Sequence, residues 1–213
     1  LFTYLIVRLL SLTSKYFSDG IIYCAHSAMK SHEKLGFKGT KKIVINNGFF
    51  TDFKLVRNES HVPRIGFVGR NIPSKNFNIF YEFLEHVEDK KHQVDVNIIG
   101  RGYDKYIKES KKFNYVNFKY SGEISDMQEQ YLNMDFLVST SSSEGFPNVI
   151  AEAMSFGVFP ICSSAGDSEY IMNNFGVVTN SKDKKIIYQH FLSGLSIISK
   201  NYSNDMHRSI RSR

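Results

Sequence analysis

From Pro63 onward, short apolar runs alternate along the chain with segments in which apolar residues recur at helical spacing. Apolar residues at positions i, i+3, i+4 and i+7, for example, mark one face of a helix expected over residues 76–88. The apolar runs predict strands at 64–68, 94–99, 116–118, 135–139 and 158–162. The other helices are expected at 103–112, 126–134, 147–156 and 183–199. This alternation is typical of an α/β fold with a doubly wound parallel sheet.

Pro160 lies in the middle of the last of these apolar runs. Proline has no N–H to donate to a neighbouring strand, so it is found on edge strands, at strand starts and at bulges. We therefore expect the strand over residues 158–162 to lie at an edge of the sheet or to be irregular.

The first fifty residues follow a different pattern. Short apolar runs at 21–24 and 42–45 predict two strands, which together with one helix are too few to enclose a core, so this segment must pack on something else. The apolar start at residues 1–12 contains Arg8 and is shorter than the roughly 20 residues that span a bilayer. Residues 52–63 are polar and irregular, as is typical of a linker.

Composition and charge exclude several classes of protein. With 213 residues, 42% of them hydrophobic and 23% charged, the chain can bury a core, which excludes a disordered or fibrous protein. Cys24 and Cys162 are too few for a disulfide framework and indicate a reducing compartment. The 27 basic and 21 acidic residues give a net charge of +6, but the basic residues are dispersed and no nucleic-acid-binding motif is present. Nucleic acid is therefore not an expected partner.

The loops at the carboxyl ends of the predicted strands are the expected ligand-binding segments, because doubly wound sheets bind ligands there. These loops are residues 69–76, 100–103, 121–125, 140–148 and 163–169. In the first loop, Arg70 and Lys75 precede the start of a helix, where free backbone N–H groups and the helix dipole favour an anion. A guanidinium and an ammonium group suit a diphosphate, although the loop alone is equally compatible with two exposed cations that bind nothing.

Two glutamates follow the predicted strand at 135–139. Glu144 lies in the loop after this strand, and Glu152 lies in the helix that comes next. Gly145 allows the backbone to come close to a ligand, and two carboxylates beside an anion site can accept hydrogen bonds from sugar hydroxyls. Alone, Glu144 is compatible with an interaction with the helix dipole, and Glu152 with a solvent-facing position. Together, in a ligand-binding loop, they indicate a sugar site.

Residues 141–157 resemble the signature of retaining glycosyltransferases of the GT-B fold, glycosyltransferase family 4. The signature is two glutamates separated by seven residues, in a setting like Ser-x-x-Glu-Gly-Phe-Pro-x-x-x-x-Glu-Ala-Met-x-x-Gly, which this chain matches. The segment at 69–76 resembles the diphosphate clamp of the same family. Three further segments match the family in order and spacing: residues 98–102, the Gly122 loop and Tyr131-x-x-x-Asp135. The resemblance covers about residues 18–200.

The resemblance also implies roles for individual residues. Arg70 and Lys75 are expected to bind the donor diphosphate and help the nucleotide leave, and Glu144 is expected to hold the donor sugar, so these three are the expected catalytic residues. Glu152 is expected to accept hydrogen bonds from the ribose hydroxyls. The full set of expected donor-binding residues is Gly69, Gly100, Arg101, Gly122, Gly145, Phe146, Pro147, Asn148, Val149 and Glu152. Glu169 is expected to be a helix-start residue and not a ligand.

By the same resemblance, residues 63–213 form the donor-binding domain, a Rossmann-like α/β domain that is the C-terminal half of a GT-B enzyme. Residues 1–62 are then the end of the N-terminal domain followed by the interdomain linker, so most of the acceptor-binding domain is expected to be missing. The implied reaction transfers a sugar from a UDP- or GDP-sugar with retention of anomeric configuration. It needs no cofactor and no metal ion.

The implied setting is the synthesis of a bacterial surface polysaccharide or glycolipid. The acceptor would be a glycan or a lipid-linked molecule, and the protein would act in the cytoplasm or in peripheral contact with the inner face of the membrane. Because a GT-B enzyme uses both domains, we expect the isolated chain to bind a nucleotide sugar weakly and to transfer it poorly or not at all. A non-catalytic nucleotide-sugar-binding module fits the same residues, whereas an epimerase of GT-B fold and a membrane-interaction protein fit them less well.

Overall fold

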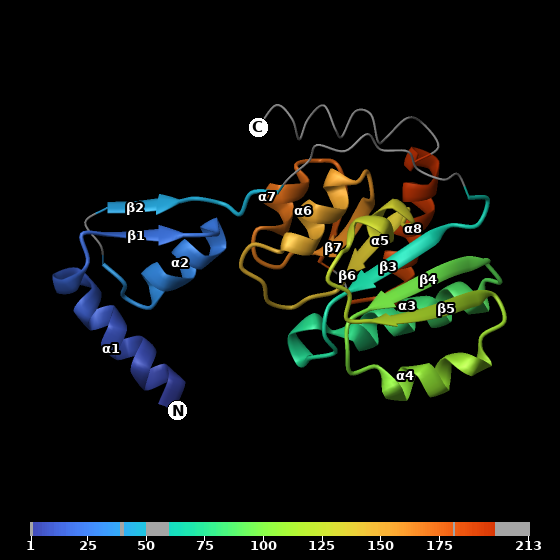
Figure 1. Ribbon diagram of the computed structural model, residues 1–213, viewed down its shortest axis with the longest axis horizontal. Helices are drawn as coiled ribbons and strands as arrows, with labels where there is room; N and C mark the ends of the chain where they lie inside the picture. The colour runs from blue at the N-terminus through green and yellow to red at the C-terminus, as the bar shows by residue number, and fades with distance from the viewer. Residues whose placement is uncertain (1, 39–40, 50–59, 181, 199–213) are drawn as a thin grey trace.

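The computed structural model describes residues 2–38, 41–49, 60–180 and 182–198, which fall into a small N-terminal unit and a larger domain (Figure 1). The N-terminal unit consists of helix α1 (Phe2–Phe17), strand β1 (Gly20–Tyr23), helix α2 (His26–Lys34) and strand β2 (Lys41–Val44). The two strands pair in parallel. Of the side chains described in this unit, only those of Ser11, Tyr23 and Ala25 are buried, so the unit has almost no core of its own.

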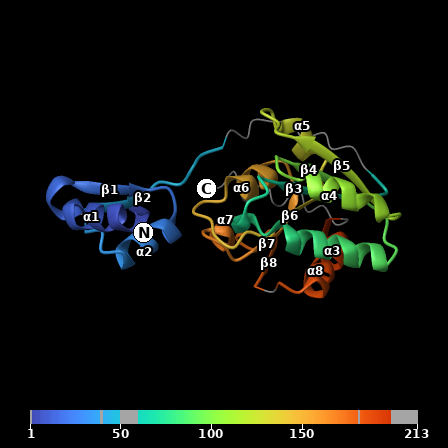
Figure 2. The same cartoon turned by 90° about the horizontal axis from the view of Figure 1, so that it is seen from below.

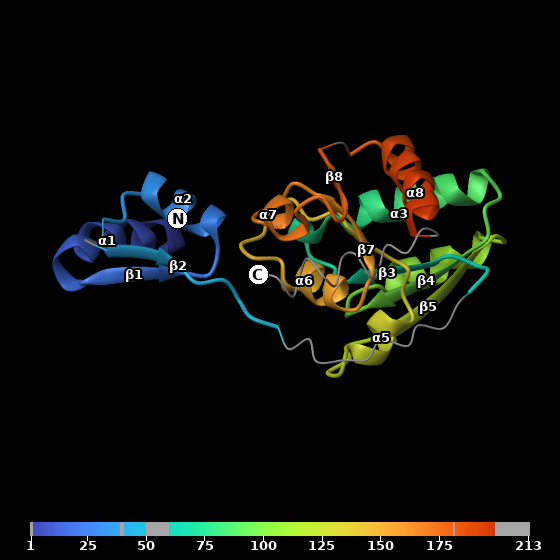
Figure 3. The same cartoon turned by 90° about the horizontal axis from the view of Figure 1, so that it is seen from above.

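The larger domain is built on a parallel six-stranded sheet with the strand order β5-β4-β3-β6-β7-β8. Its strands are β3 (Arg64–Val68), β4 (Val94–Ile99), β5 (Val116–Gly122), β6 (Phe136–Ser139), β7 (Phe159–Ser163) and β8 (Val177–Thr179). Its helices are η1 (Pro73–Lys75), α3 (Phe77–Asp89), α4 (Asp104–Glu109), η2 (Ser110–Lys112), α5 (Gln128–Leu132), α6 (Asn148–Ser155), α7 (Ser168–Met172) and α8 (Lys184–Ile198). Helices α3 and α8 lie on one face of the sheet, and α5 and α6 lie on the other (Figures 2 and 3). The expected α/β fold with a doubly wound parallel sheet is therefore confirmed.

The strand order reverses between β3 and β6. From β3 the chain runs outward through β4 and β5, and it then returns to β6 beside β3 and runs outward through β7 and β8 on the other side. Such a switch point opens a crevice at the carboxyl ends of the two central strands, where doubly wound domains bind ligands. At the opposite, amino ends of these strands, Arg64 Nη2 lies 2.9 Å from Asp135 Oδ1 and holds β3 against β6.

The core packs the expected face of α3 against the sheet. Phe80 and Phe83 are fully buried, and the Phe80 ring lies 4.9 Å from the ring of Phe67 in β3. Phe83 also contacts Phe191 of α8, with 6.0 Å between the ring centroids, which joins the two helices on this face. The helix that the apolar spacing predicts over residues 76–88 is thus confirmed, with its bounds moved by one residue.

Pro160 lies in β7, which is an interior strand between β6 and β8, so the expectation of an edge strand is wrong. The N–H of Phe159 donates to Asp135 O at 2.9 Å, in the direction of β6. Successive residues of a strand direct their N–H groups to opposite neighbours, so the missing N–H of Pro160 would face the β8 side. The pairing of β7 with β8 begins only at Ile161 with Val177. The N–H that Pro160 lacks would therefore face the residues that precede β8, outside the paired part of the two strands.

Helix α1 forms from the apolar start of the chain, for which the sequence predicts no element. It has 16 residues, and the side chains of Leu5, Leu9 and Leu12 on it are more than half exposed. Within the described residues, no helix combines the length and the apolar content that crossing a membrane requires.

Candidate functional site

The crevice between β3 and β6 holds an ion pair formed by two of the expected catalytic residues. Lys75 lies in the segment after β3, and Glu144 lies in the loop after β6. Lys75 Nζ is 2.6 Å from Glu144 Oε1, and the two side chains are only 20% and 18% exposed. The strand order therefore brings together two side chains that are 69 positions apart in the sequence.

Hydrogen bonds fix the segment of Lys75 against the loop of Glu144. The buried Thr140 hydroxyl donates to the backbone O of Lys75 at 3.0 Å. The N–H of Ser142 donates to Ser74 O at 2.8 Å. Both bonds cross from the loop after β6 to the segment after β3, so the two side chains meet because their backbones are joined.

Arg70, the third expected catalytic residue, follows β3 directly and is exposed. Its backbone O accepts the N–H of Ile72 at 2.9 Å. Its guanidinium makes no hydrogen bond or ion pair with the residues that the structure describes. The structure thus pairs Lys75 with Glu144 and leaves the Arg70 side chain in solvent beside the crevice.

Three of the expected donor-binding glycines, Gly69, Gly100 and Gly122, form one cluster at the ends of β3, β4 and β5. The N–H of Gly69 donates to Ile99 O at 2.9 Å, and the N–H of Gly100 donates to Gly122 O at 2.7 Å. Gly100 has a φ of 132°, and a Cβ atom there would lie 1.9 Å from Gly69 O. Only glycine fits this contact, so the loops approach each other more closely than side chains would allow.

Tyr103 belongs to this cluster, although the sequence assigns it no role. Its hydroxyl donates to Gly69 O at 2.7 Å, and the residue is buried. Burial raises the pKa of the Tyr103 phenol well above its usual value, so the hydroxyl remains a donor at neutral pH. The only sign of this role in the sequence is that Tyr103 lies in the loop over residues 100–103, which is one of the expected ligand-binding segments.

Arg101 lies at the exposed edge of the glycine cluster. Its Nε is 3.5 Å from Glu123 Oε1, and both side chains are more than half exposed. Its backbone O accepts the N–H of Asn71 at 2.9 Å, which fixes the main chain. Because an ion pair this exposed contributes little to stability, the Arg101 side chain can leave Glu123 for a ligand at small cost.

Glu152, in α6, accepts a hydrogen bond from a buried tyrosine. Tyr131 Oη lies 2.7 Å from Glu152 Oε2, and Tyr131 is 1% exposed. Burial, together with the nearby carboxylate, raises the pKa of the Tyr131 phenol, which therefore remains a donor at neutral pH. One oxygen of Glu152 is thus held in place, and the other makes no hydrogen bond to the described residues. The spacing of Tyr131 matches the family, but the sequence assigns it no role.

The remaining expected donor-binding residues surround the start of α6. Gly145, Phe146 and Pro147 form the segment before the helix, which begins at Asn148. The first N–H groups of a helix, here those of Asn148 and Val149, have no carbonyl acceptor within the helix. They lie at the positive end of the helix dipole and are therefore suited to a phosphate.

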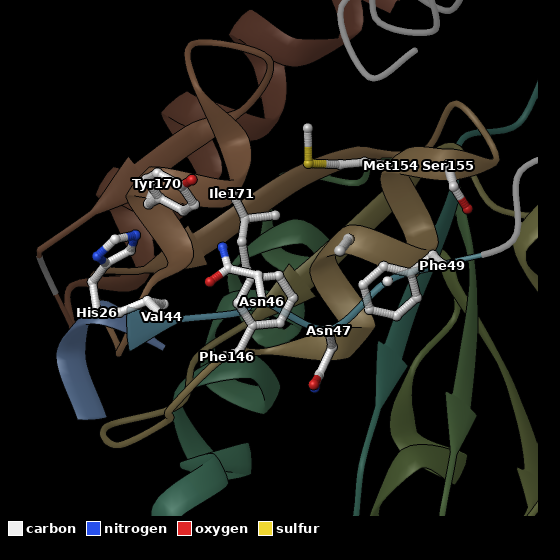
Figure 4. A pocket seen from close by; sticks show the side chains of 12 residues that line it. His26, Val44, Asn46, Asn47, Phe49, Phe146, Met154, Ser155, Tyr170 and Ile171 are labelled. Atoms are coloured by element: carbon white, nitrogen blue, oxygen red, sulfur yellow. The ribbon is translucent and has the colours of Figure 1, made fainter. Parts of the chain in front are cut away.

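Two of these residues also contact the segment that follows β2 of the N-terminal unit. Asn47 Nδ2 donates to Asn148 Oδ1 at 2.8 Å, and the ring of Phe49 stacks on that of Phe146 with 6.2 Å between centroids. A cavity of about 660 Å³ lies beside these contacts, between the N-terminal unit and helices α6 and α7 (Figure 4). Its walls include His26, Asn46, Phe146, Met154, Tyr170 and Ile171. The sequence does not predict this cavity, because its walls come from distant parts of the chain.

Glu169 is the second residue of α7, which agrees with its expected place at a helix start. Its carboxylate accepts a hydrogen bond from Ser164 Oγ at 2.6 Å. Across the part of the chain that the structure describes, no three His, Cys, Asp or Glu side chains come together as a metal site. The expectation that the reaction needs no metal ion stays a prediction.

Comparison of the sequence with known proteins finds one family and a curated relative. The sequence model of the family described as "Glycosyl transferases group 1" matches residues 62–196, which is more than half of the chain. Protein CapJ of Staphylococcus aureus is 25% identical over 148 residues, covering 67% of this chain and 37% of CapJ. The chain therefore spans well under half of the length of this relative.

Solved structures show the same fold. HepE of Anabaena, determined in complex with UDP-glucose, matches with a TM-score of 0.70 at 19% identity, covering 99% of this chain and 67% of HepE. WaaG, a glycosyltransferase involved in lipopolysaccharide biosynthesis, matches with a TM-score of 0.77 at 15% identity, covering 90% of this chain and 58% of WaaG. These similarities establish the fold, that of the Rossmann-like domain of GT-B enzymes.

Proposed function

Because the chain belongs to the family of glycosyl transferases group 1, we propose that it is the donor-binding part of a retaining glycosyltransferase of family 4. The observation that carries this proposal is the 2.6 Å ion pair of Lys75 and Glu144 at the switch point of the sheet. Arg70 adds a second cation and Glu152 a second carboxylate around the same crevice. This set matches the two chemical parts of a nucleotide sugar, an anionic diphosphate and the hydroxyl groups of ribose and sugar.

The two cations act on the donor diphosphate. Arg70 and Lys75 bind its oxygens and stabilise the negative charge that develops on the leaving phosphate as its bond to the anomeric carbon breaks. The acceptor hydroxyl approaches the same face of the sugar and gives its proton to the leaving phosphate, so the new bond keeps the anomeric configuration. The cations supply the compensating charge, and the proposed reaction uses no metal ion and no cofactor.

Glu144 accepts hydrogen bonds from the donor sugar while Lys75 compensates its charge. A carboxylate without this partner would repel the diphosphate and would itself lie largely buried and unpaired. The ammonium group has three donors, so in the complex it can bind the carboxylate and a phosphate oxygen together. The sugar and the diphosphate then lie on either side of the Lys75–Glu144 pair.

The nucleoside part of the donor lies along the glycine cluster. Glu152, fixed by Tyr131 at 2.7 Å, accepts hydrogen bonds from the ribose hydroxyls. The N–H groups of Asn148 and Val149 at the start of α6 bind the phosphates. The base occupies the space next to Arg101, between the loops after β4 and β5.

The relatives support a more specific substrate class. The HepE complex with UDP-glucose favours a UDP-sugar as the donor, with a GDP-sugar as the alternative. The role of WaaG in lipopolysaccharide biosynthesis favours a bacterial surface glycolipid or polysaccharide as the product. The acceptor is then a glycan or a lipid-linked molecule, reached from the cytoplasm or at the inner face of the membrane.

A calorimetric screen of UDP, GDP, ADP and their sugars against the full chain tests the proposal. We expect one nucleotide to bind, and we expect Arg70→Ala and Glu152→Ala each to weaken it about tenfold, since each removes a charge-assisted contact. Lys105→Ala is the matched control, because Lys105 is an exposed cation on α4. The site assignment is wrong if no nucleotide binds or if both variants bind like the parent.

Tyr131→Phe is expected to lower the affinity for a nucleoside diphosphate about three- to tenfold, because Glu152 loses the hydrogen-bond donor that fixes its carboxylate. The corresponding 2′,3′-dideoxynucleoside diphosphate lacks the hydroxyls assigned to Glu152, so we expect the variant and the parent to bind it with the same affinity. Calorimetry with both ligands measures the difference. An equal loss for the two ligands would mean that Tyr131 only packs the core.

A second function, nucleotide-sugar binding without transfer, is compatible with the same site. It is favoured by the N-terminal unit, in which only Ser11, Tyr23 and Ala25 of the described side chains are buried, so that the unit has almost no core of its own. Donor binding with no sugar transfer is its expected result. Robust turnover by the 213-residue chain would exclude it.

A further inference from the structure

A buried carboxylate, that of Asp167, joins the N-terminal unit to the larger domain. Its Oδ2 accepts the N–H of His26 at 2.6 Å, and its Oδ1 accepts the N–H of Ser27 at 2.8 Å. These are the first two residues of α2, whose N–H groups have no carbonyl acceptor within the helix and lie at the positive end of its dipole. Asp167 is only 4% exposed, and both of its oxygens are paired, as a buried carboxylate requires.

The backbone of Asp167 lies against the loop that contains Glu144. The N–H of Asp167 donates to Gly145 O at 2.9 Å, and Ser27 Oγ donates to the same oxygen at 3.2 Å. Gly166 has a φ of 62°, and a Cβ atom there would lie 2.2 Å from Gly145 O and 2.6 Å from Glu144 O. Glycine therefore allows direct backbone contact, and hydrogen bonds run without interruption from α2 through Asp167 to Gly145.

We propose that Asp167 is a positioning residue for the donor sugar, because it makes the conformation of the Glu144–Phe146 loop depend on the N-terminal unit. The inference rests on the proposed function, which assigns the sugar to Glu144. The carboxylate of Asp167 bonds to α2 and its N–H bonds to Gly145, so a shift of α2 moves the loop. Lys75, on the other side of Glu144, is fixed by the larger domain. The loop is thus supported from both parts of the chain.

A purely structural role has different consequences. A helix cap that only stabilises α2 would leave the Glu144–Phe146 loop and the binding of the sugar unchanged. A positioning role requires the loop to change whenever the contact between α2 and Asp167 is lost. The diphosphate is assigned to Arg70, Lys75 and the N–H groups of Asn148 and Val149, all outside the Glu144–Phe146 loop, so its binding serves as an internal reference.

Asp167→Asn removes the contact with little change in side-chain volume. The amide nitrogen of asparagine places a donor opposite one of the two backbone N–H groups, so only one of the two hydrogen bonds can survive. Glu169→Gln is the matched control. It makes the same chemical change two residues away, at an exposed carboxylate that accepts from Ser164.

His26→Pro tests the same contact from the other side and leaves Asp167 intact. Proline is compatible with the first position of a helix, which His26 occupies, and Ala25 before it already has the extended backbone, with φ −150° and ψ 145°, that proline requires. The substitution removes the N–H that Asp167 Oδ2 accepts. His26→Ala is its control, because it keeps this N–H and removes only the ring that contacts Tyr170.

Amide NMR of the full chain without nucleotide is the first measurement. In the two variants, the Gly145 and Phe146 amide resonances are expected to shift. In Asp167→Asn, the Ser27 amide is expected to exchange with solvent about tenfold faster than in the parent. The two controls are expected to resemble the parent. Unshifted Gly145 and Phe146 resonances in both variants would overturn the proposal.

Calorimetry with UDP and UDP-glucose is the second measurement. The two variants are expected to bind UDP-glucose about tenfold more weakly than the parent and to bind UDP within about twofold of it. Equal losses for both ligands, or none for either, would leave Asp167 with a structural role and overturn the proposal. If the parent binds neither ligand, the proposed function fails, and the amide resonances still decide whether Asp167 controls the loop.

Discussion

Gly100→Ala is expected to lower the free energy of unfolding by about 2–6 kcal/mol, from overpacking and backbone strain of about 1–3 kcal/mol each. The added Cβ would lie 1.9 Å from Gly69 O, and alanine is strained at a φ of 132°. Relief of the contact requires the backbone to move. That movement breaks the hydrogen bonds that join Gly69 to Ile99 and Gly100 to Gly122.

Urea unfolding followed by circular dichroism measures this loss of stability. Gly48→Ala is the control, because no heavy atom lies within 4 Å of the position that its Cβ would take. The control is expected to change the free energy of unfolding by no more than about 0.5 kcal/mol. A Gly100→Ala variant with the unfolding midpoint of the parent would show that the loops have room to separate.

Lys75→Ala is expected to weaken UDP binding about a hundredfold, which corresponds to about 3 kcal/mol. The substitution removes one cation from the diphosphate site. It also leaves the Glu144 carboxylate, which is 18% exposed, without its partner at 2.6 Å and with a charge that repels the ligand. Calorimetry with UDP measures the loss, with Lys105→Ala as the exposed-cation control.

A double variant separates these two effects of Lys75. In Lys75→Ala with Glu144→Gln, the repelling carboxylate is gone, so UDP affinity is expected to recover about tenfold relative to Lys75→Ala alone. The affinity for UDP-glucose should not recover, because Glu144 is assigned to the sugar. Losses of UDP affinity that simply add in the double variant would contradict an electrostatic coupling between the two residues.

Local spacing is enough to predict most of the larger domain. The apolar residues that define β4 and α3 lie within a few positions of each other, and the predicted bounds agree with the structure to within one residue. Strand β8 and helix α7 have only three and five residues, which is too short for a period to appear. Pro160 is a different case, because the cost of its missing N–H depends on where β8 begins, and no local pattern contains that information.

The sequence identifies most residues of the candidate site but does not predict which of them contact each other. Arg70, Lys75 and the two glutamates stand out from their loops and their family signature, whereas the Lys75–Glu144 pair depends on β6 lying beside β3. Tyr131 and Asp167 receive no role from the sequence, because each acts through side-chain contacts to distant residues. The spacing of Tyr131 and Asp135 matches the family, but it does not show that the Tyr131 hydroxyl bonds to Glu152.

Because the site lies between β3 and β6, it forms only at a late stage of folding. β3 pairs with β6 although β4 and β5 lie between them in the sequence, and the residues of the ion pair are 69 positions apart. Contacts of such long sequence separation must close a large loop, so they form after the local β–α–β units. At the proposed site, a nucleotide would therefore bind only to a chain that has completed the centre of its sheet, and by mass action it would stabilise that state alone. In the proposed function, binding of the donor therefore reports that the non-local pairing of β3 with β6 is in place.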